Sequence, residues 1–174
     1  MGLLAHKLDK LPSKKVELPV LDKPVATCDI KIPVPAMQKI QERFIELQPE
    51  AQNGTDVTGH VFCEGMYSRQ YFLPKGHYAV SLMHAKQNFF VVIQGECIIA
   101  GEDGMIQVKA PFMTVTQPGT KRLIQALEDT VFVTFHPNPD NETDLVKLEQ
   151  KFVVPESGVK RDLSIRHSNR KILA

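Results

Sequence analysis

The spacing of apolar residues changes along the chain. Between residues 60 and 138 they form short runs rich in β-branched and aromatic residues, separated by turn sequences such as Pro-Lys-Gly, Glu-Asp-Gly and Pro-Gly. Many short runs with glycine or proline between them are typical of an all-β barrel or sandwich, not of alternating β and α elements. We therefore predict a mainly β barrel in this region.

The segments before the barrel carry different signals. Residues 1–34 contain repeated X-Pro steps, which remove amide donors and favour extended backbone, so we predict an extended, proline-rich arm. Residues 35–59 are predicted to form a helix, with apolar residues every three or four positions, followed by a polar loop. Two alternating runs in the arm would let it add as an edge strand to its own barrel or a partner's: Val16, Leu18 and Val20, and Ile30, Ile32 and Val34.

Residues 139–153 are predicted to form a second helix after the barrel. Asn141 is the expected N-cap, and Leu145, Leu148 and Phe152 make an apolar stripe at helical spacing. We expect this helix to pack on the outside of the barrel. Residues 154–174 form a basic tail, which we interpret as a solvated or partner-docked arm.

Composition narrows the class of protein. The 174 residues carry a formal net charge of +1, and no apolar run approaches the roughly 20 residues that cross a bilayer. We expect a cytoplasmic protein without a membrane partner, because the first residues do not have the form of a signal peptide. Three widely spaced cysteines without a CxxC pair argue against a disulfide framework or a zinc ribbon. Nucleic acid is not an expected partner, since the barrel segment is roughly charge-balanced.

Two segments have the layout of a known pair of motifs. The run PKGHYAVSLMHAKQNFFVVIQGE, residues 74–96, is a glycine-led turn, a strand, and a second strand that ends in glycine. The run APFMTVTQPGTKRLIQALED, residues 110–129, centres on Pro118-Gly119. This layout resembles the two motifs of the cupin superfamily. The resemblance implies a double-stranded β-helix, or jelly-roll, barrel with an extended N-terminal arm and a few flanking helices.

In that superfamily the motifs supply two histidines, a glutamate and a third histidine to a metal in the barrel mouth. Anchored on Gly95 and Pro118-Gly119, the matching positions here are Leu82, His84, Asn88 and Arg122. One imidazole and one amide oxygen are a weak donor set, and Arg122 adds a permanent positive charge. We therefore expect a degenerate metal site and no cofactor. A site rebuilt around His84 by His60, His77 or His136, with a carboxylate from Glu64 or Glu128, is the alternative.

The barrel mouth could instead bind an anion. A buried Arg122 requires either an internal carboxylate, for which Glu128 and Glu64 are the candidates, or an anionic ligand. The lysines flanking the mouth favour a small anion such as a phosphate or carboxylate. The candidate ligand-binding residues are His84, Asn88, Arg122, Lys86, Lys121, Gln125, Arg69 and His77.

The strand that begins at Asn88 has two apolar faces. Period-two alternation sends Asn88, Phe90 and Val92 to one face, and Phe89, Val91 and Ile93 to the other. One face fills the barrel, so the other must be covered by an arm, a helix or a second subunit. We expect a homodimer or a higher homo-oligomer.

A narrower set of sequence features lies around these motifs. It comprises Glu64–Gln70, Leu73–Gly76, Lys109–Pro111, the run PGTKR, Ala126–Thr130, His136-Pro137 and Thr143-Asp144. As a set, between about Gly65 and Phe152, these features resemble cupin-like proteins encoded by bacteriophages. The resemblance implies homodimerisation through outer strands and the N-terminal arm, and an accessory role during infection. It implies no reaction.

Three functions are compatible with this sequence. We favour a non-catalytic protein that binds a small anionic molecule, one version being the sequestration of a nucleotide signal of host antiviral defence. The first alternative is a metal-dependent cupin enzyme, an isomerase or dioxygenase, with a reorganised site. The second is a structural or protein-interaction module. The sequence contains no Walker loop, dinucleotide-binding GxGxxG, GxSxG or HExxH motif.

Overall fold

A computed structural model describes residues 26–47 and 58–156 of the chain. Those residues form ten strands and two helices. The expectations for the alternating run at 16–20, for the loop residues 48–57 and for the tail residues 157–174 concern segments outside the described residues. No helix in the described ranges is long and apolar enough to span a bilayer.

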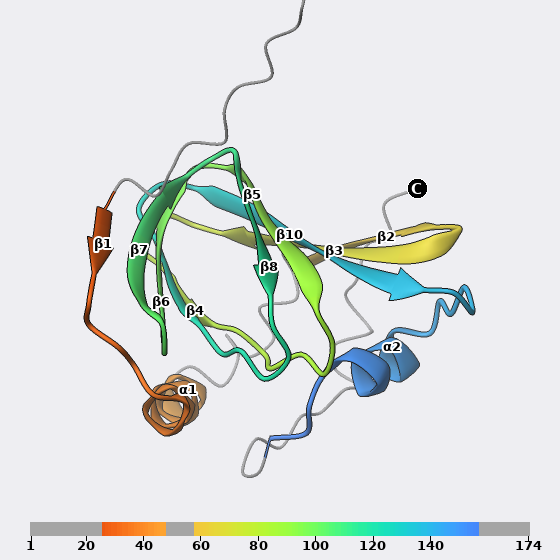
Figure 1. The fold of residues 1–174 in the computed structure, drawn as a ribbon, viewed down its shortest axis with the longest axis horizontal. Helices are drawn as coiled ribbons and strands as arrows, with labels where there is room; N and C mark the ends of the chain where they lie inside the picture. Colours follow the sequence, from red (N-terminus) through yellow and green to blue (C-terminus); the bar gives the residue numbers. More distant parts are fainter. Residues whose placement is uncertain (1–25, 48–57, 157–174) are drawn as a thin grey trace, which may run out of the picture.

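Two antiparallel sheets of five strands each make up the barrel (Figure 1). The first has the order β1 (Ala26–Cys28), β7 (Gly104–Lys109), β6 (Glu96–Gly101), β9 (Leu123–Ala126), β4 (Tyr78–Val80). The second has the order β2 (Thr58–Cys63), β3 (Gly65–Leu73), β10 (Thr130–Asn138), β5 (Asn88–Gln94), β8 (Phe112–Thr116). Apart from the consecutive pairs β2–β3 and β6–β7, neighbours in each sheet come from distant parts of the chain. The mainly β, double-stranded β-helix barrel predicted from the sequence is therefore confirmed.

The hydrophobic core lies between the two sheets. Phe90 and Phe132 enter it from one sheet, and Ile99 and Ile124 from the other, and all four are buried. Each fully buried side chain of this size stabilises the fold by about 1.5–3 kcal/mol relative to exposure. The inner faces of both sheets are therefore occupied by side chains over most of their length.

A glycine at the end of β5 forms the tight connection that takes the chain from β5 in one sheet to β6 in the other. Gly95 has a φ of +82°, and a Cβ at this position would clash with the carbonyl oxygen of Asp129. Both the backbone conformation and the close approach exclude other residues. The glycine that anchors the first motif is thus required by the geometry of the barrel.

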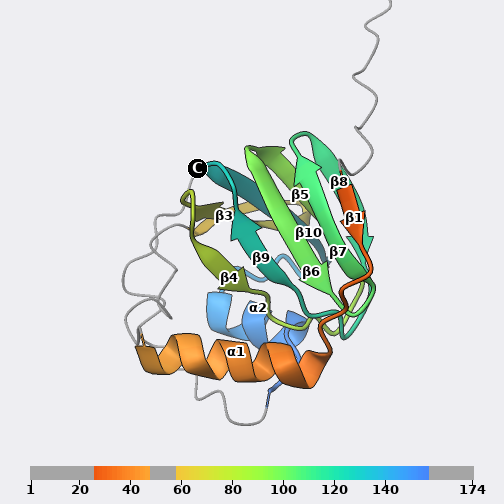
Figure 2. The ribbon, with the colours of Figure 1, turned by 90° about the vertical axis from the view of Figure 1, so that its left-hand side faces the viewer.

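Helix α1 (Val34–Leu47) matches the helix predicted from Pro35 onward. Met37, on its apolar stripe, is completely buried. Before it, β1 adds to the edge of β7, as expected for the arm, although the paired residues are 26–28 and not the alternating run at 30–34. Figure 2 shows α1 crossing the end of the barrel at which the second helix also lies.

Helix α2 (Leu145–Phe152) differs from the expectation in two ways. Its N-cap is Asp144, whose carboxylate accepts hydrogen bonds from the amides of Val146 and Lys147, whereas Asn141 has a φ of +51° and its side chain accepts from the amide of Gly65. The helix also does not pack on the outside. Leu148 and Phe152 lie against Tyr67, on the inner side of β3, so α2 closes one end of the barrel.

Candidate functional site

Strand β5 places one of the four motif positions, Asn88, on its inner face. Asn88 is the first residue of the strand and is 5% exposed, and Phe90 and Val92 follow it into the core. Phe89 and Ile93 are exposed on the other face. The predicted alternation along this strand is therefore confirmed.

Arg122 also points into the barrel. It directly precedes β9. Because it is two and four residues before the buried Ile124 and Ala126, it lies on the same face of the extended backbone as they do. Its Nη1 donates a hydrogen bond of 2.7 Å to Oγ1 of Thr116, and its Cζ lies 5.4 Å from the centre of the Phe90 ring. Thr116 is in turn the β-sheet partner of Asn88. Arg122, Asn88 and Phe90 thus meet at one place in the barrel mouth.

The charge of Arg122 has no carboxylate partner among residues 26–47 and 58–156. None of the ion pairs in these ranges includes it, and both carboxylates considered from the sequence, Glu64 and Glu128, are exposed. Burial lowers the pKa of Arg122, while the carboxylate of Asp103 acts in the opposite direction. A guanidinium remains protonated in proteins, so the half-buried cation persists.

His84 lies in the same region, and its imidazole is neutral. Burial is the main cause of a pKa lowered to about 4, and the positive charges of Arg69 and Arg122 lower it further. The ring is 5.1 Å, centre to centre, from the ring of His136. A neutral imidazole can donate one hydrogen bond and accept another, so His84 can contact a ligand without adding charge.

Asn88 contributes an open acceptor. Its Nδ2 donates a long hydrogen bond of 3.4 Å to the carbonyl oxygen of Lys86. Its Oδ1 is buried and has no donor in the described part of the chain. Burying an amide oxygen without a donor costs about 1–3 kcal/mol, so this atom is a position for a ligand N–H or O–H group.

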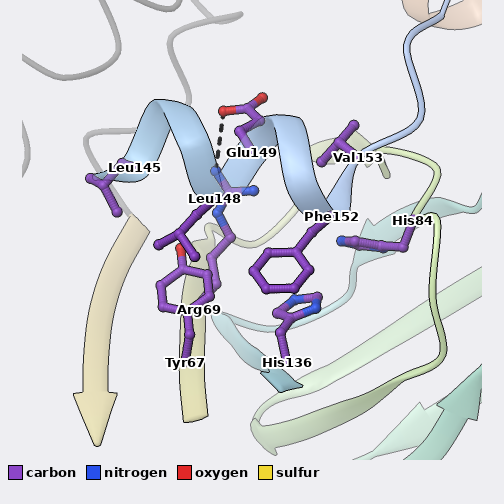
Figure 3. A pocket seen from close by; sticks show the side chains of 9 residues that line it. All are labelled: Tyr67, Arg69, His84, His136, Leu145, Leu148, Glu149, Phe152 and Val153. Carbon is purple, nitrogen blue, oxygen red and sulfur yellow. Dashed lines mark ion pairs between the residues drawn. The ribbon is translucent and has the colours of Figure 1, made fainter. Parts of the chain in front are cut away.

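The sequence did not indicate the small, partly open cavity beside this region (Figure 3). It has room for about one water molecule. Its walls are Tyr67, Arg69, His84, His136, Leu145, Leu148, Glu149, Phe152 and Val153. Alternation along β3 and β10 could have placed Tyr67, Arg69 and His136 on the inner face, but the residues of α2 are brought there by the tertiary fold alone.

His136 and Phe152 form the centre of this cavity wall. Their rings stack at 4.8 Å, and Nε2 of His136 is 3.0 Å from Oγ1 of Thr134. Burial lowers the pKa of His136 to about 3, with smaller contributions from His84 and Arg69. Like His84, His136 is neutral at physiological pH.

Four expected site residues lie elsewhere. The ammonium of Lys121 points away from the mouth and is buried against Gln41, the carbonyl oxygen of Ser81 and the carboxylate of Glu156. Gln125 faces outward, because Ile124 and Ala126 on either side of it face inward. His77 is exposed in the turn before β4, with its ring next to the carbonyl oxygen of Lys75. Lys86 is exposed, and only its backbone carbonyl contacts Asn88.

The motif residues do not fit the metal that the cupin layout implies. Leu82 has no donor atom, and Arg122 can only donate hydrogen bonds. Within the described ranges, no group of three or more histidine, cysteine or acidic residues is arranged to hold a metal ion. The donor set is therefore suited to an anion, not a cation.

Comparisons with known proteins find similar solved structures. No protein-family model matches the chain, and no curated protein matches its sequence. Among solved structures, it is similar to a cupin-2 domain protein of Shewanella frigidimarina, with 18% identity over 45% of this chain and 76% of the other, at a TM-score of 0.38. A double-stranded β-helix protein of Klebsiella pneumoniae has 19% identity, over 48% of this chain and 76% of the other, at a TM-score of 0.40. The cupin-2 domain of a transcriptional regulator of Enterobacter cloacae has 14% identity, over 47% of this chain and 97% of the other, at a TM-score of 0.41.

Proposed function

We propose that this protein is a non-catalytic, cupin-like binding protein whose barrel mouth holds a small anionic molecule. The observation that carries the proposal is Arg122, a half-buried guanidinium without a carboxylate partner among the described residues. A desolvated guanidinium forms strong, directional hydrogen bonds with carboxylates and phosphates. An anionic ligand would supply the missing partner.

The neighbouring groups define what the ligand must offer. Phe90 provides an apolar surface beneath the guanidinium, and the Oδ1 atom of Asn88 accepts from a donor. His84, a neutral imidazole because burial and the charges of Arg69 and Arg122 lower its pKa, can add one further hydrogen bond. The ligand we propose is thus a carboxylate or phosphate that also carries a hydroxyl, amine or amide group.

A narrower version of this proposal is the capture of a nucleotide signal of host antiviral defence by a phage-encoded protein. Nucleotides combine phosphate groups with hydroxyl and amino donors, so their chemistry matches these three side chains. The phage origin rests on the sequence resemblance described above. Isothermal titration against cyclic nucleotides and ADP-ribose derivatives tests this version, and the absence of heat across that panel would remove it.

The general proposal is tested with Arg122→Gln. This variant keeps a hydrogen-bond donor near Thr116 but removes the charge, so we expect at least about a tenfold loss of affinity for the best-binding anion, equivalent to about 1.4 kcal/mol. Arg43→Gln is the matched control, because Arg43 is an exposed arginine on α1. Equal affinities of wild type and Arg122→Gln in isothermal titration would contradict the proposal.

A further inference from the structure

A second arginine in the barrel is incompletely satisfied. The side chain of Arg69, on β3, is 8% exposed, and its Nη2 lies 3.7 Å from Oε2 of Glu149 on α2. That distance is longer than a hydrogen bond. Its Nε is buried and has no acceptor in the described part of the chain. Since a buried guanidinium is costly unless its donors are used, Arg69 can accommodate a better-placed anion than Glu149.

The cavity beside Arg69 is covered by α2. Figure 3 shows Glu149 and Phe152 reaching from the helix toward Arg69 and His136, which rise from the sheet. The space between them admits about one water molecule, so a larger group enters only if α2 moves. Glu149 therefore occupies, from within the chain, the position that an anionic group would take on Arg69.

His84 connects this cavity to the site around Arg122. Arg122 lies over Phe90, whose β-sheet partner Thr134 contacts the ring of His136. The His136 ring is in turn 5.1 Å from that of His84, which lines the cavity together with Arg69. The backbone on either side of His84 is also hydrogen-bonded to the end of α2. The amide of Ala85 donates to the carbonyl oxygen of Phe152, and the amide of Val154 donates to that of Met83.

Building on the anion-binding function proposed above, we propose that the ligand carries two anionic groups. Arg122 binds the first group. The second binds Arg69, replaces the carboxylate of Glu149 there, and displaces α2 from the cavity. His84 lies beside the segment that joins the two groups. Binding of such a ligand and opening of the barrel end are then a single event.

The first test compares ligands that differ by one anionic group. Succinate is measured against butyrate, and diphosphate against phosphate, by isothermal titration with the full chain. We expect each doubly anionic member to bind about tenfold more tightly. The variant Arg69→Met/Glu149→Met replaces the pair by apolar side chains of similar volume, a change that buried pairs often tolerate. It should lose this preference, so that succinate binds no more tightly than butyrate and diphosphate no more tightly than phosphate.

The second test uses Glu149→Gln, which removes the competing carboxylate. The affinity for succinate or diphosphate should rise about fivefold or more, whereas that for butyrate or phosphate should not change. Glu46→Gln, at an exposed position of α1, is the matched control and should leave all four affinities unchanged. Circular dichroism establishes that each variant is folded before titration.

The outcomes separate this inference from the proposed function. If the wild type binds singly and doubly anionic probes equally, and Arg69→Met/Glu149→Met behaves in the same way, the two-anion inference is overturned and anion binding at Arg122 stands. If neither the wild type nor Glu149→Gln binds any of the four probes or the nucleotide panel, anion binding itself fails, and this inference fails with it.

Discussion

At the scale of single residues, the candidate site consists of polar groups that lack partners within residues 26–47 and 58–156. Core strands position both the Oδ1 atom of Asn88 and the guanidinium of Arg122, but in these ranges the first has no donor and the second has no carboxylate. Folding alone would favour apolar residues here, because unpaired buried polar atoms are destabilising. Their presence at one place is what a preformed binding site requires.

Asn88→Leu is expected to separate stability from binding. Leucine has a similar volume and removes the unpaired oxygen, so the free energy of unfolding should rise by about 1 kcal/mol in urea denaturation. Affinity for the anionic ligand should fall, because its donor group loses an acceptor. A variant that is less stable than the wild type would contradict the burial argument for this side chain.

The two buried imidazoles predict a pH-dependent stability. The pKa values of His84 and His136 fall from about 6.5 to about 4 and 3 in the folded protein, so the unfolded chain binds more protons below pH 6.5. Stability is therefore complete above this pH and is lost as the pH falls, by up to about 1.4 kcal/mol per pH unit for each histidine.

Urea denaturation at pH 7.5, 6.5 and 5.5 measures this dependence in a range where most carboxylates remain ionised. His136→Phe keeps an aromatic ring stacked on Phe152. It should reduce the change of the unfolding free energy with pH by the contribution of one histidine. His77→Gln, at an exposed turn, should not change it. A free energy of unfolding that is constant between pH 7.5 and 5.5 would show that the histidines are not held neutral by burial.

At the scale of elements, a buried ion pair joins the parts that surround the mouth. Lys121 Nζ lies 2.8 Å from Oε2 of Glu156, and both side chains are completely buried. Lys121 also donates to Gln41 on α1, and Glu156 accepts from the amide of Met83. The pair therefore fixes α1, the loop that carries His84 and the segment after α2 relative to one another.

Removing one partner of this pair should be strongly destabilising. Lys121→Met or Glu156→Gln leaves a buried charge or a buried polar group without its counterpart, so we expect a loss of about 3–5 kcal/mol in chemical denaturation. The double variant Lys121→Met/Glu156→Leu should recover most of that loss. If the double variant is as unstable as the single variants, the ion pair is not the origin of the lost stability.

The sequence predicted the strands and the motif residues better than it predicted the surroundings of the site. Period-two alternation and two anchors, Gly95 and Pro118-Gly119, were sufficient to place His84, Asn88 and Arg122. Lys121 was misplaced because it is adjacent to Arg122, and adjacent residues in extended backbone point to opposite sides. Glu149 could not be predicted, because α2 reaches the cavity through contacts between segments that are distant in the sequence.

At the scale of the whole molecule, one face of the barrel remains apolar and exposed. It combines Phe89 and Ile93 of β5, Met113 and Val115 of β8, and Phe135 of β10, which the strand register places side by side. Phe89, near the centre of this face, is 48% exposed. A contiguous apolar face of this kind is suited to pairing with the same face of a second copy.

We therefore expect a homodimer in solution. Phe89→Lys/Val115→Lys introduces charges at the centre of this face and should give a folded monomer in size-exclusion chromatography with light scattering. Ile30→Lys, at an exposed apolar residue before α1, is the control and should remain dimeric. A monomeric wild type at micromolar concentration would contradict this expectation.

Native mass spectrometry of the protein purified directly from cells tests the central claim most directly, because it detects a retained molecule whatever its chemical identity. The wild type should carry a small additional mass that is released on denaturation and ionises as an anion. Arg122→Gln, purified in parallel, should lack it. An identical bound mass in both proteins would place the ligand away from Arg122 and contradict the anion site described above.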